Sequence, residues 1–457
     1  MKSKCNVNRF SHPLAFGEGA RVWGMTANKN NSRIIRAWCA YDWANSVYSL
    51  VITSAIFPIY YQATAKGENG SDIVSFLFWS DIPNSALYSY ALSFSFLIIT
   101  PLLPLLSGVA DFAGKKKFFM KMFCTIGSMA CVGMFFFDKT NLGWGIACII
   151  FASIGYSGSL VFYDAFLPEI ATEDQFDRIS AKGYSWGYYG GVVLLVMCLA
   201  LIQFHEAIGF KDKQDTMVRF SFLLVGVWWI GFAQIPFALL PEEVRKAKAT
   251  IGQGYRELAN VWKSFAENQD LKKYILAFFF FNMGVQTVMY MAATFGAKEL
   301  KLADNKLILT VLLIQLVAAV GAHVFARLSG SMGNKKVLIM MIVFWIFICI
   351  DAYFVYTEWQ FYALACAVGV VMGGIQSLSR ATYTKLIPKG SIDTASYFSF
   401  FDVTFNLSIV VGTFTYGFIE HLTGSMRNST LAIAVFFVLG LLLLTQVRSP
   451  SIMKKND

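Results

Sequence analysis

The sequence predicts an all-α integral membrane protein whose twelve transmembrane helices form two pseudo-symmetric bundles of six. Three observations support this: the composition, twelve apolar segments, and landmarks that recur half a chain apart. Hydrophobic residues make up 56% of the 457 residues and charged residues 14%, with a mean hydropathy of +0.54. A soluble core of this length cannot hide so much apolar surface. The lipid bilayer is therefore the expected environment of the chain.

Apolar runs of about 18 or more residues, interpreted as membrane spans, fall into two sets of six. The first set occupies 35–240 and comprises 35–61, 86–109, 118–137, 142–168, 185–204 and 218–240. The second set occupies 273–446 and comprises 273–298, 307–328, 337–356, 361–387, 396–420 and 429–446. A polar connector, 241–272, separates the two sets, and the tails 1–34 and 447–457 flank them.

The distribution of Lys and Arg predicts the orientation. When alternate loops are counted together, the side that holds both termini carries 29 of the 38 Lys and Arg residues. Because cytoplasmic loops hold the excess of these residues, both termini are expected to be cytoplasmic, most simply in a cell (inner) membrane. The net charge of +10 reflects this orientation, and no basic groove with stacking aromatics indicates nucleic acid. The tail 1–34 lacks the apolar core of a signal peptide, and Met25 is an alternative start.

Landmarks of the first half recur in the second. SGVADFAGKKK follows the second span and ARLSGSMGNKK follows the eighth, and their glycines, Gly114 and Gly333, are 219 residues apart. The fourth span ends at Pro168 and the tenth at Pro388, an offset of 220. Two landmarks in register predict duplicated halves, which is a known transporter architecture.

Polar side chains recur at helical spacing in spans 1, 4, 7 and 10. They are Asp42, Asn45, Ser46, Ser49 and Thr53 in the first, Ser153, Tyr156, Ser157 and Asp164 in the fourth, Asn282, Gln286, Tyr290 and Thr294 in the seventh, and Gln376, Ser379, Arg380 and Tyr383 in the tenth. Spans 3, 6, 9 and 12 are nearly all apolar. Because polar groups in hydrocarbon are costly, the first group is expected to line an aqueous path for a small polar solute and the second to face lipid. Alternatively, the polar residues only join helices.

Four charged side chains lie at a comparable depth near the cytoplasmic side: Asp42, Asp164, Arg380 and Asp402. Asp42, for example, is about six residues, or roughly 9 Å, beyond Arg36. One network is expected, and its role stays open between an ion-paired gate and a carboxylate whose protonation is coupled to transport. Three acids against one base favour a titrating group, with Asp42 as the candidate. Arg380 is also suited to holding a solute carboxylate with two hydrogen bonds.

Other chemistry finds no support in the sequence. Seven of the eight cysteines fall inside apolar segments and none forms a C-x-x-C pair, so neither disulfides nor a metal site is expected. H-E-x-x-H and P-loop elements are absent, which argues against an enzyme and against a cofactor. His323 stands alone in the eighth span and is typical of a packing residue.

The loop SGVADFAGKKK is similar to the signature of the major facilitator superfamily. More narrowly, DWANSVYS, FYDAFLPEIA, RISAKGYSWGYYGG, SLSRATYTKLIP and LTGSMRN resemble the "unknown major facilitator" family, which is related to autophagy-linked vacuolar effluxer permeases. The resemblance extends from about Arg36 to the last span. Ser107, Phe112 and Gly330 depart from the superfamily pattern, and Gly330 replaces the aspartate of the second half.

The resemblance implies a monomeric transporter that works by alternating access, and it makes amino acids or peptides the expected solutes, with protons as a possible coupling ion. It assigns a gating role to the loops that carry Asp111, Gly114, Lys115 and Gly333. The Asp111 carboxylate is expected to accept hydrogen bonds from a helix N-terminus, that of the eleventh span. A non-transporting receptor or scaffold on the same fold is the alternative.

Overall fold

The computed structural model describes residues 29–448 except 68–69, 72, 78, 208, 211–212, 243–258, 260, 392 and 424. The elements of the N-terminal half are α2 (Ser32–Val47), η1 (Tyr48–Ala55), α3 (Phe57–Thr64), β1 (Ile73–Phe76), β2 (Trp79–Pro83), α4 (Asn84–Ala113), α5 (Lys116–Gly133), η3 (Met134–Phe136), α6 (Leu142–Asp164), α7 (Leu167–Ile170), η4 (Glu173–Gln175), α8 (Phe176–Gln203) and α9 (Gln214–Leu239). Those of the C-terminal half are α11 (Gln269–Leu300), α12 (Asp304–Met332), α13 (Asn334–Tyr353), α14 (Glu358–Leu386), α15 (Thr394–Thr423) and α16 (Met426–Thr445).

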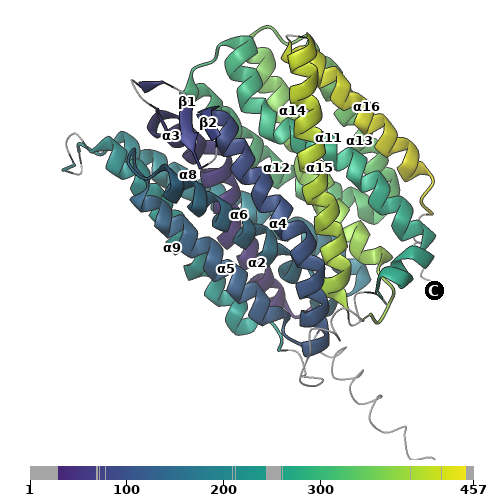
Figure 1. Ribbon diagram of the computed structural model, residues 1–457. Helices are drawn as coiled ribbons and strands as arrows, with labels where there is room; N and C mark the ends of the chain where they lie inside the picture. The colour runs from purple at the N-terminus through teal and green to yellow at the C-terminus, as the bar shows by residue number, and fades with distance from the viewer. Residues whose placement is uncertain are drawn as a thin grey trace, which may run out of the picture.

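The two halves lie side by side as helical bundles, with α4 and α15 in contact at their boundary (Figure 1). Within the described residues, eleven helices are long and apolar enough to cross a membrane. The run α2, η1 and α3 supplies a further span, because only Ile56 separates η1 from α3. The fold is thus consistent with the twelve spans that the sequence predicts.

The first span is not the uninterrupted helix that 35–61 suggests. Residues 48–55 form a π-helix, in which each backbone N–H reaches back five residues. Hydroxyl groups follow the same spacing: Ser54 Oγ donates to the Ser49 carbonyl (2.8 Å) and Thr53 Oγ1 to the Tyr48 carbonyl (3.5 Å). Side-chain hydroxyls that compete for backbone carbonyls distort helices, and Pro58 then marks the start of α3.

Two further features differ from the sequence analysis. The connector is shorter than 241–272, because α11 already begins at Gln269 and residues 261–267 are helical; residues 243–258 and 260 lie outside the described part. The loop between the first two spans carries an antiparallel hairpin in which Ile73 pairs with Pro83. The apolar spans dominate the pattern, so a short hairpin in a polar loop leaves no periodicity to detect.

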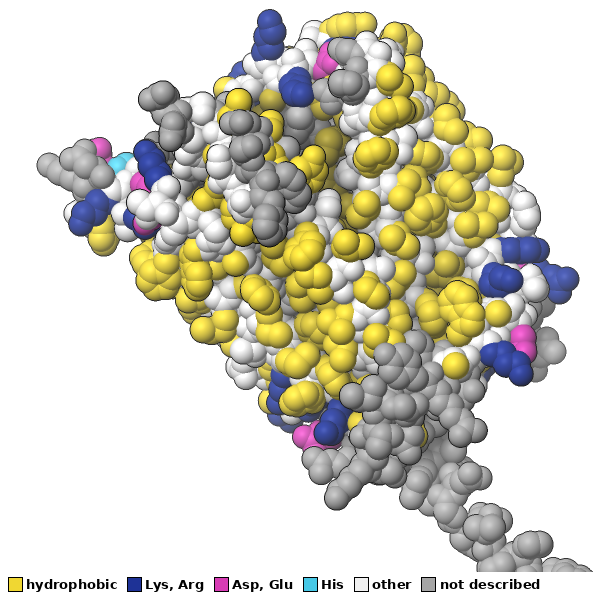
Figure 2. Space-filling view, in the orientation of Figure 1, with side chains coloured by type: hydrophobic (Ala, Val, Ile, Leu, Met, Phe, Trp, Pro, Cys, Tyr) yellow, Lys and Arg dark blue, Asp and Glu magenta, His cyan; other side chains and the backbone are white. Residues whose placement is uncertain are grey.

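Burial of the spans follows their division by polarity in part. The spans of α6 and α14 are 72% and 61% buried within the protein, against 33% for α16, but that of α4, which belongs to neither group, is 28% buried and that of α13 is 44% buried. Large apolar side chains stand exposed on the polar-poor helices: Phe118 and Met129 on α5, Val227 and Ile235 on α9, Phe344 and Phe347 on α13, and Val435 and Leu442 on α16. Figure 2 shows apolar side chains over the middle of the molecule and charged ones towards its two ends. This band is the surface expected to face lipid.

Both α4–α5 and α12–α13 turns lie at one end of the bundle, which we call the inner end because the Lys and Arg distribution predicts it to be cytoplasmic. Gly114 ends α4 in the left-handed conformation (φ 61°), which closes the turn into α5. At the equivalent position Gly333 has φ 84° and joins α12 to α13. Both glycines thus provide a positive φ at corresponding turns, although their ψ angles, 45° and 147°, differ.

Candidate functional site

Arg380 of α14 reaches out of the C-terminal half into the N-terminal half. Its guanidinium donates from Nε to Ser180 Oγ (2.9 Å), from Nη1 to Asp164 Oδ1 (2.9 Å) and from Nη2 to the Ser180 carbonyl (3.1 Å). Nη2 also lies 3.5 Å from Asp42 Oδ2. The Arg380 side chain is only 2% exposed, so this contact is a buried ion pair between the two halves.

Aromatic rings enclose the same guanidinium. Its central carbon lies 4.3 Å from the ring centre of Tyr184 and 4.7 Å from that of Trp38, with Tyr163 at 5.7 Å. These distances are within the range of cation–π attraction. Tyr163 also donates from its hydroxyl to Asp42 Oδ2 (2.6 Å). We call Trp38, Asp42, Tyr163, Asp164, Ser180 and Tyr184 the Arg380 pocket.

Asp402 does not join the ion pair, contrary to the expectation of a single four-membered network. It is buried on α15, its Oδ2 atom has no hydrogen-bond partner, and the described residues show no ion pair for it. One turn further on, Asn406 is also buried with an unpartnered Nδ2. The structure thus divides the acids into two bound to Arg380 and one left alone.

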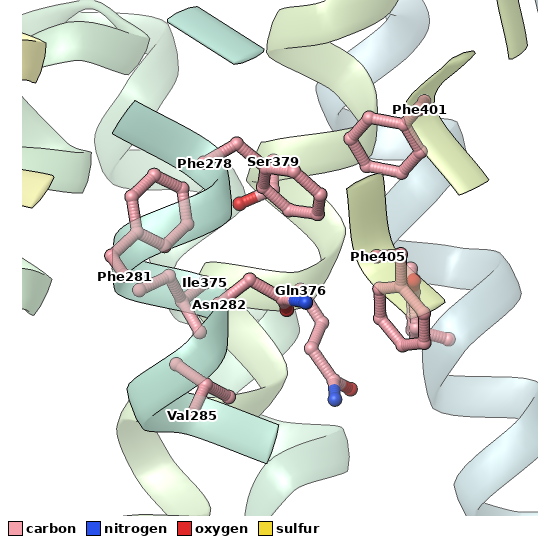
Figure 3. A pocket seen from close by; sticks show the side chains of 10 residues that line it. Phe278, Phe281, Asn282, Val285, Ile375, Gln376, Ser379, Phe401 and Phe405 are labelled. Atoms are coloured by element: carbon pink, nitrogen blue, oxygen red, sulfur yellow. The ribbon is translucent and has the colours of Figure 1, made fainter. Parts of the chain in front are cut away.

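A small hollow of about 20 Å³, roughly the space of one water molecule, lies beside the Arg380 pocket and is lined by residues of α8, α11, α14 and α15. Figure 3 shows the amides of Asn282 and Gln376 directed into the space between phenylalanine rings of α11 and α15. Asn282 donates to Ser408 Oγ (2.6 Å), and Gln376 Oε1 accepts from the Tyr188 hydroxyl (2.7 Å). Tyr184 borders both this hollow and the guanidinium.

The remaining members of the polar stripes occupy varied positions. Gln286 donates to Asn282 Oδ1 (3.3 Å), and Asn45 is buried with Nδ2 unpartnered. Half-buried are Ser46, Ser49, Tyr156 and Tyr290. The Ser49 hydroxyl donates a hydrogen bond to the Ser46 carbonyl (3.0 Å). The lining of the hollow therefore includes Asn282 and Gln376 of the predicted path, while the α2 residues lie away from it.

Asp111 makes the contact expected of it. Its Oδ1 accepts from the Ala395 N–H (3.2 Å), and Oδ2 accepts from the N–H and the hydroxyl of Ser396 (both 2.7 Å). These groups belong to the first turn of α15, where unpaired N–H groups attract an anion. Asp111 therefore ties α4 of one half to α15 of the other.

Lys116, which the sequence analysis did not select, completes this contact. Lys115 stands exposed at the turn, whereas Lys116 is buried and its ammonium binds Glu169, Asp111 (3.4 Å) and Thr394 Oγ1 (2.8 Å). The lysine run KKK does not reveal which member points inward. We call Asp111, Lys116, Glu169, Thr394 and Ser396 the Asp111 latch.

A second contact joins α8 to the α12–α13 turn, and sequence reasoning missed it entirely. Asp177 accepts hydrogen bonds from Asn334 Nδ2 (2.7 Å) and from Ser329 Oγ (3.0 Å), and its Oδ2 lies 2.7 Å from Lys385 Nζ. We call Asp177, Ser329, Asn334 and Lys385 the Asp177 latch. Asp177 lies in the first turn of α8, which begins nine residues before the predicted span 185–204, so the sequence did not mark its position.

The contacts between the halves include one buried ion pair and two latches in the inner half of the bundle. Comparison with solved structures assigns the fold. The Escherichia coli fucose:proton symporter aligns with a TM-score of 0.65 at 14% identity, covering 92% of this chain and 98% of that one. The proton:xylose symporter XylE gives 0.69 at 12%, covering 91% and 96%. The chain therefore has the major facilitator fold.

Sequence comparison narrows the assignment. The uncharacterized MFS-type transporter YxiO of Bacillus subtilis is 29% identical over 416 residues, covering 90% of this chain and 94% of the relative. Autophagy-related protein 22 of Kluyveromyces lactis is 25% identical and 79% of each chain is covered. Residues 30–456 match the family described as "Vacuole effluxer Atg22 like". The chain belongs to this family, as its resemblance to the effluxer-related transporters suggested.

Proposed function

We propose that the protein is a secondary active transporter that moves a small polar solute by alternating access. The two halves rock about the central hollow, and the Arg380 ion pair closes the inner side. The observation that carries this proposal is the position of Arg380: it belongs to the C-terminal half, yet its charged partners, Asp42 and Asp164, belong to the N-terminal half. An inner opening must therefore break this contact.

The hollow supports a solute with hydrogen-bonding groups and an apolar part. Asn282, Gln376 and Ser379 provide polar atoms, and the Ser379 hydroxyl has no partner in the described structure. Phe278, Phe281, Phe401 and Phe405 supply apolar walls. Amino acids or short peptides combine both properties. We place the monomeric transporter in a cell membrane, with both termini in the cytoplasm.

Of the two roles open for Asp42, its contact with Arg380 favours the gate. Asp42→Asn leaves Arg380 with Asp164 as its remaining carboxylate partner, so closure of the inner side is expected to weaken by about 1.5–3 kcal/mol, the contribution of one contact to a charged group. Asp402 is the better candidate for a coupled proton, because among the described residues no cation contacts its carboxylate. Asp402→Asn should abolish proton-driven accumulation but spare solute exchange. Accumulation by Asp402→Asn at the wild-type level would remove it from coupling.

Uptake by proteoliposomes tests the proposal. Purified protein is reconstituted and offered a panel of labelled amino acids, dipeptides and sugars with and without a pH gradient. Saturable uptake of one class is expected, with a loss of at least about tenfold in Arg380→Gln, the change in rate or equilibrium that about 1.4 kcal/mol produces. Arg36→Gln changes an exposed arginine at the start of α2 and serves as the matched control. Binding of a solute without any transport would instead indicate a receptor.

A further inference from the structure

The pocket that holds Arg380 is built entirely by the N-terminal half. Trp38 and Asp42 come from α2, Tyr163 and Asp164 from α6, and Ser180 and Tyr184 from α8. We propose that, once Arg380 withdraws, this pocket is an inward-facing binding site for a guanidinium or primary ammonium group of a solute. The inference rests on alternating access and deepens it, because it turns a closing contact into a ligand site.

The pocket keeps its shape without Arg380, because its parts hold one another. Trp38 Nε1 donates to the Tyr163 carbonyl (3.0 Å), and the two rings stack at 4.5 Å between centres. The Tyr163 hydroxyl fixes the Asp42 carboxylate at 2.6 Å. Gly183 allows α8 to approach, since a Cβ there would collide with the Asp42 carboxylate and the Trp38 ring. None of these contacts involves the C-terminal half.

The charge of the pocket explains why another cation is expected to bind when Arg380 withdraws. Arg380 brings one positive charge to two carboxylates, Asp42 and Asp164, which are both at least nine-tenths buried. Its departure leaves two acids among aromatic rings, where unpaired charge is unfavourable. A cation with N–H donors can satisfy both carboxylates, the Ser180 oxygens and the ring faces together. Arg380 is therefore an internal substitute for such a group.

Competition between the two cations links binding to gating. A solute cation in the pocket prevents Arg380 from returning and so holds the inner side open. When Arg380 returns, the displaced group can move past Tyr184, which borders both the pocket and the central hollow. The solute thus passes from a charged inner site to the amide-lined hollow in a single closing movement.

Binding to a variant with a vacant pocket tests this site without measuring transport. Arg380→Ala in detergent is titrated with methylguanidinium and n-butylammonium in the millimolar range, against sodium chloride at equal ionic strength. A saturable rise in melting temperature of about 3 °C is expected, accompanied by quenching or a shift of Trp38 fluorescence. Tetramethylammonium, which has no N–H donor, should bind more weakly. Arg36→Ala, with its pocket occupied, should show none of these effects.

A second variant set keeps the test decisive. Asp42→Asn and Asp164→Asn, added to Arg380→Ala, should abolish the saturable effect; an equal effect in this triple variant would overturn the site. If Arg380→Ala does not fold, Arg380→Met retains the apolar stem and replaces it. No saturable effect in either single variant also overturns the site. Failure of solute uptake with binding intact would instead count against the transporter proposal alone.

Discussion

The two latches occupy equivalent places in the two halves but place their charges differently. In the Asp111 latch the acid sits on the α4–α5 turn and accepts backbone N–H groups of α15. In the Asp177 latch the acid sits in the first turn of α8, and the donors are side chains, including Asn334 and Lys385. Both arrangements put an anion near a helix N-terminus, which the helix dipole favours.

The difference shows how a duplicated fold can preserve a contact while exchanging its residues. Gly330 lies 219 residues after Asp111 and has no side chain that could accept a hydrogen bond. A Cβ added at this position would have no atom within 4 Å. Asp177 supplies the missing carboxylate from α8, the helix that contacts the α12–α13 turn. One latch therefore depends on backbone donors, whereas the other depends on mobile side chains, and the two should respond differently to mutation and to salt.

The largest effect is expected from removing both acids, Asp111→Asn with Asp177→Asn. Each amide keeps one acceptor oxygen, so each loss of charge should cost roughly 1–2 kcal/mol, and the pair should shift the balance towards an open inner end by about 30- to 900-fold. Electron–electron distances between spin labels at Lys115 and Lys336, both exposed on the two turns, measure the shift. Unchanged distances would show that Arg380 alone closes the inner side.

Asp111→Asn alone should have the next largest effect. The amide retains one acceptor oxygen but loses the charge that attracts Lys116 and the α15 N-terminus. A shift of about 5- to 30-fold towards the open form is expected, from roughly 1–2 kcal/mol. The same label pair measures it, with Asp138→Asn, an acid in an outer loop outside the spans, as control. A shift no larger than that of the control would contradict the backbone latch.

Lys385→Met should act more weakly and in a salt-dependent way. The Lys385 and Asp177 side chains are 14% and 11% exposed, so ions in solution partly screen their attraction. An effect of about 0.5–1 kcal/mol at low salt, decreasing towards 1 M salt, is expected. Asp111→Asn should show little salt dependence by comparison, and equal salt sensitivity of the two variants would remove the proposed distinction.

The smallest effect is expected for Gly330→Asp. The side chain fits, because nothing lies within 4 Å of the Cβ position, but Asp177 already provides the anion at the α8 N-terminus. A second carboxylate there gains little and meets a like charge. The ratio of closed to open forms, measured from the label distances, should therefore change by less than about twofold. A strong shift towards the closed form would mean that the Asp177 latch is incomplete.

The Asp111 contact was expected because the resemblance to the superfamily loop signature assigns a gating role to this aspartate, and helix N-termini attract anions. It did not find Lys116 or Asp177, because the choice among adjacent lysines and the pairing of α8 with the α12–α13 turn depend on how helices rotate and dock. The π-helix of the first span was likewise hidden, since its hydroxyl-to-carbonyl bonds do not alter the apolar pattern.

By itself the sequence determined the membrane environment, the spans and the duplicated halves, because hydropathy and spacing along one helix are local properties. It also placed Asp42, Asp164, Arg380 and Asp402 at one depth. Only the tertiary structure decided that two of these acids bind Arg380 and that Asp402 does not. The physical reason is that depth follows from position along a helix, whereas partners follow from helix rotation and close approach, such as that of α8 to α2 at Gly183.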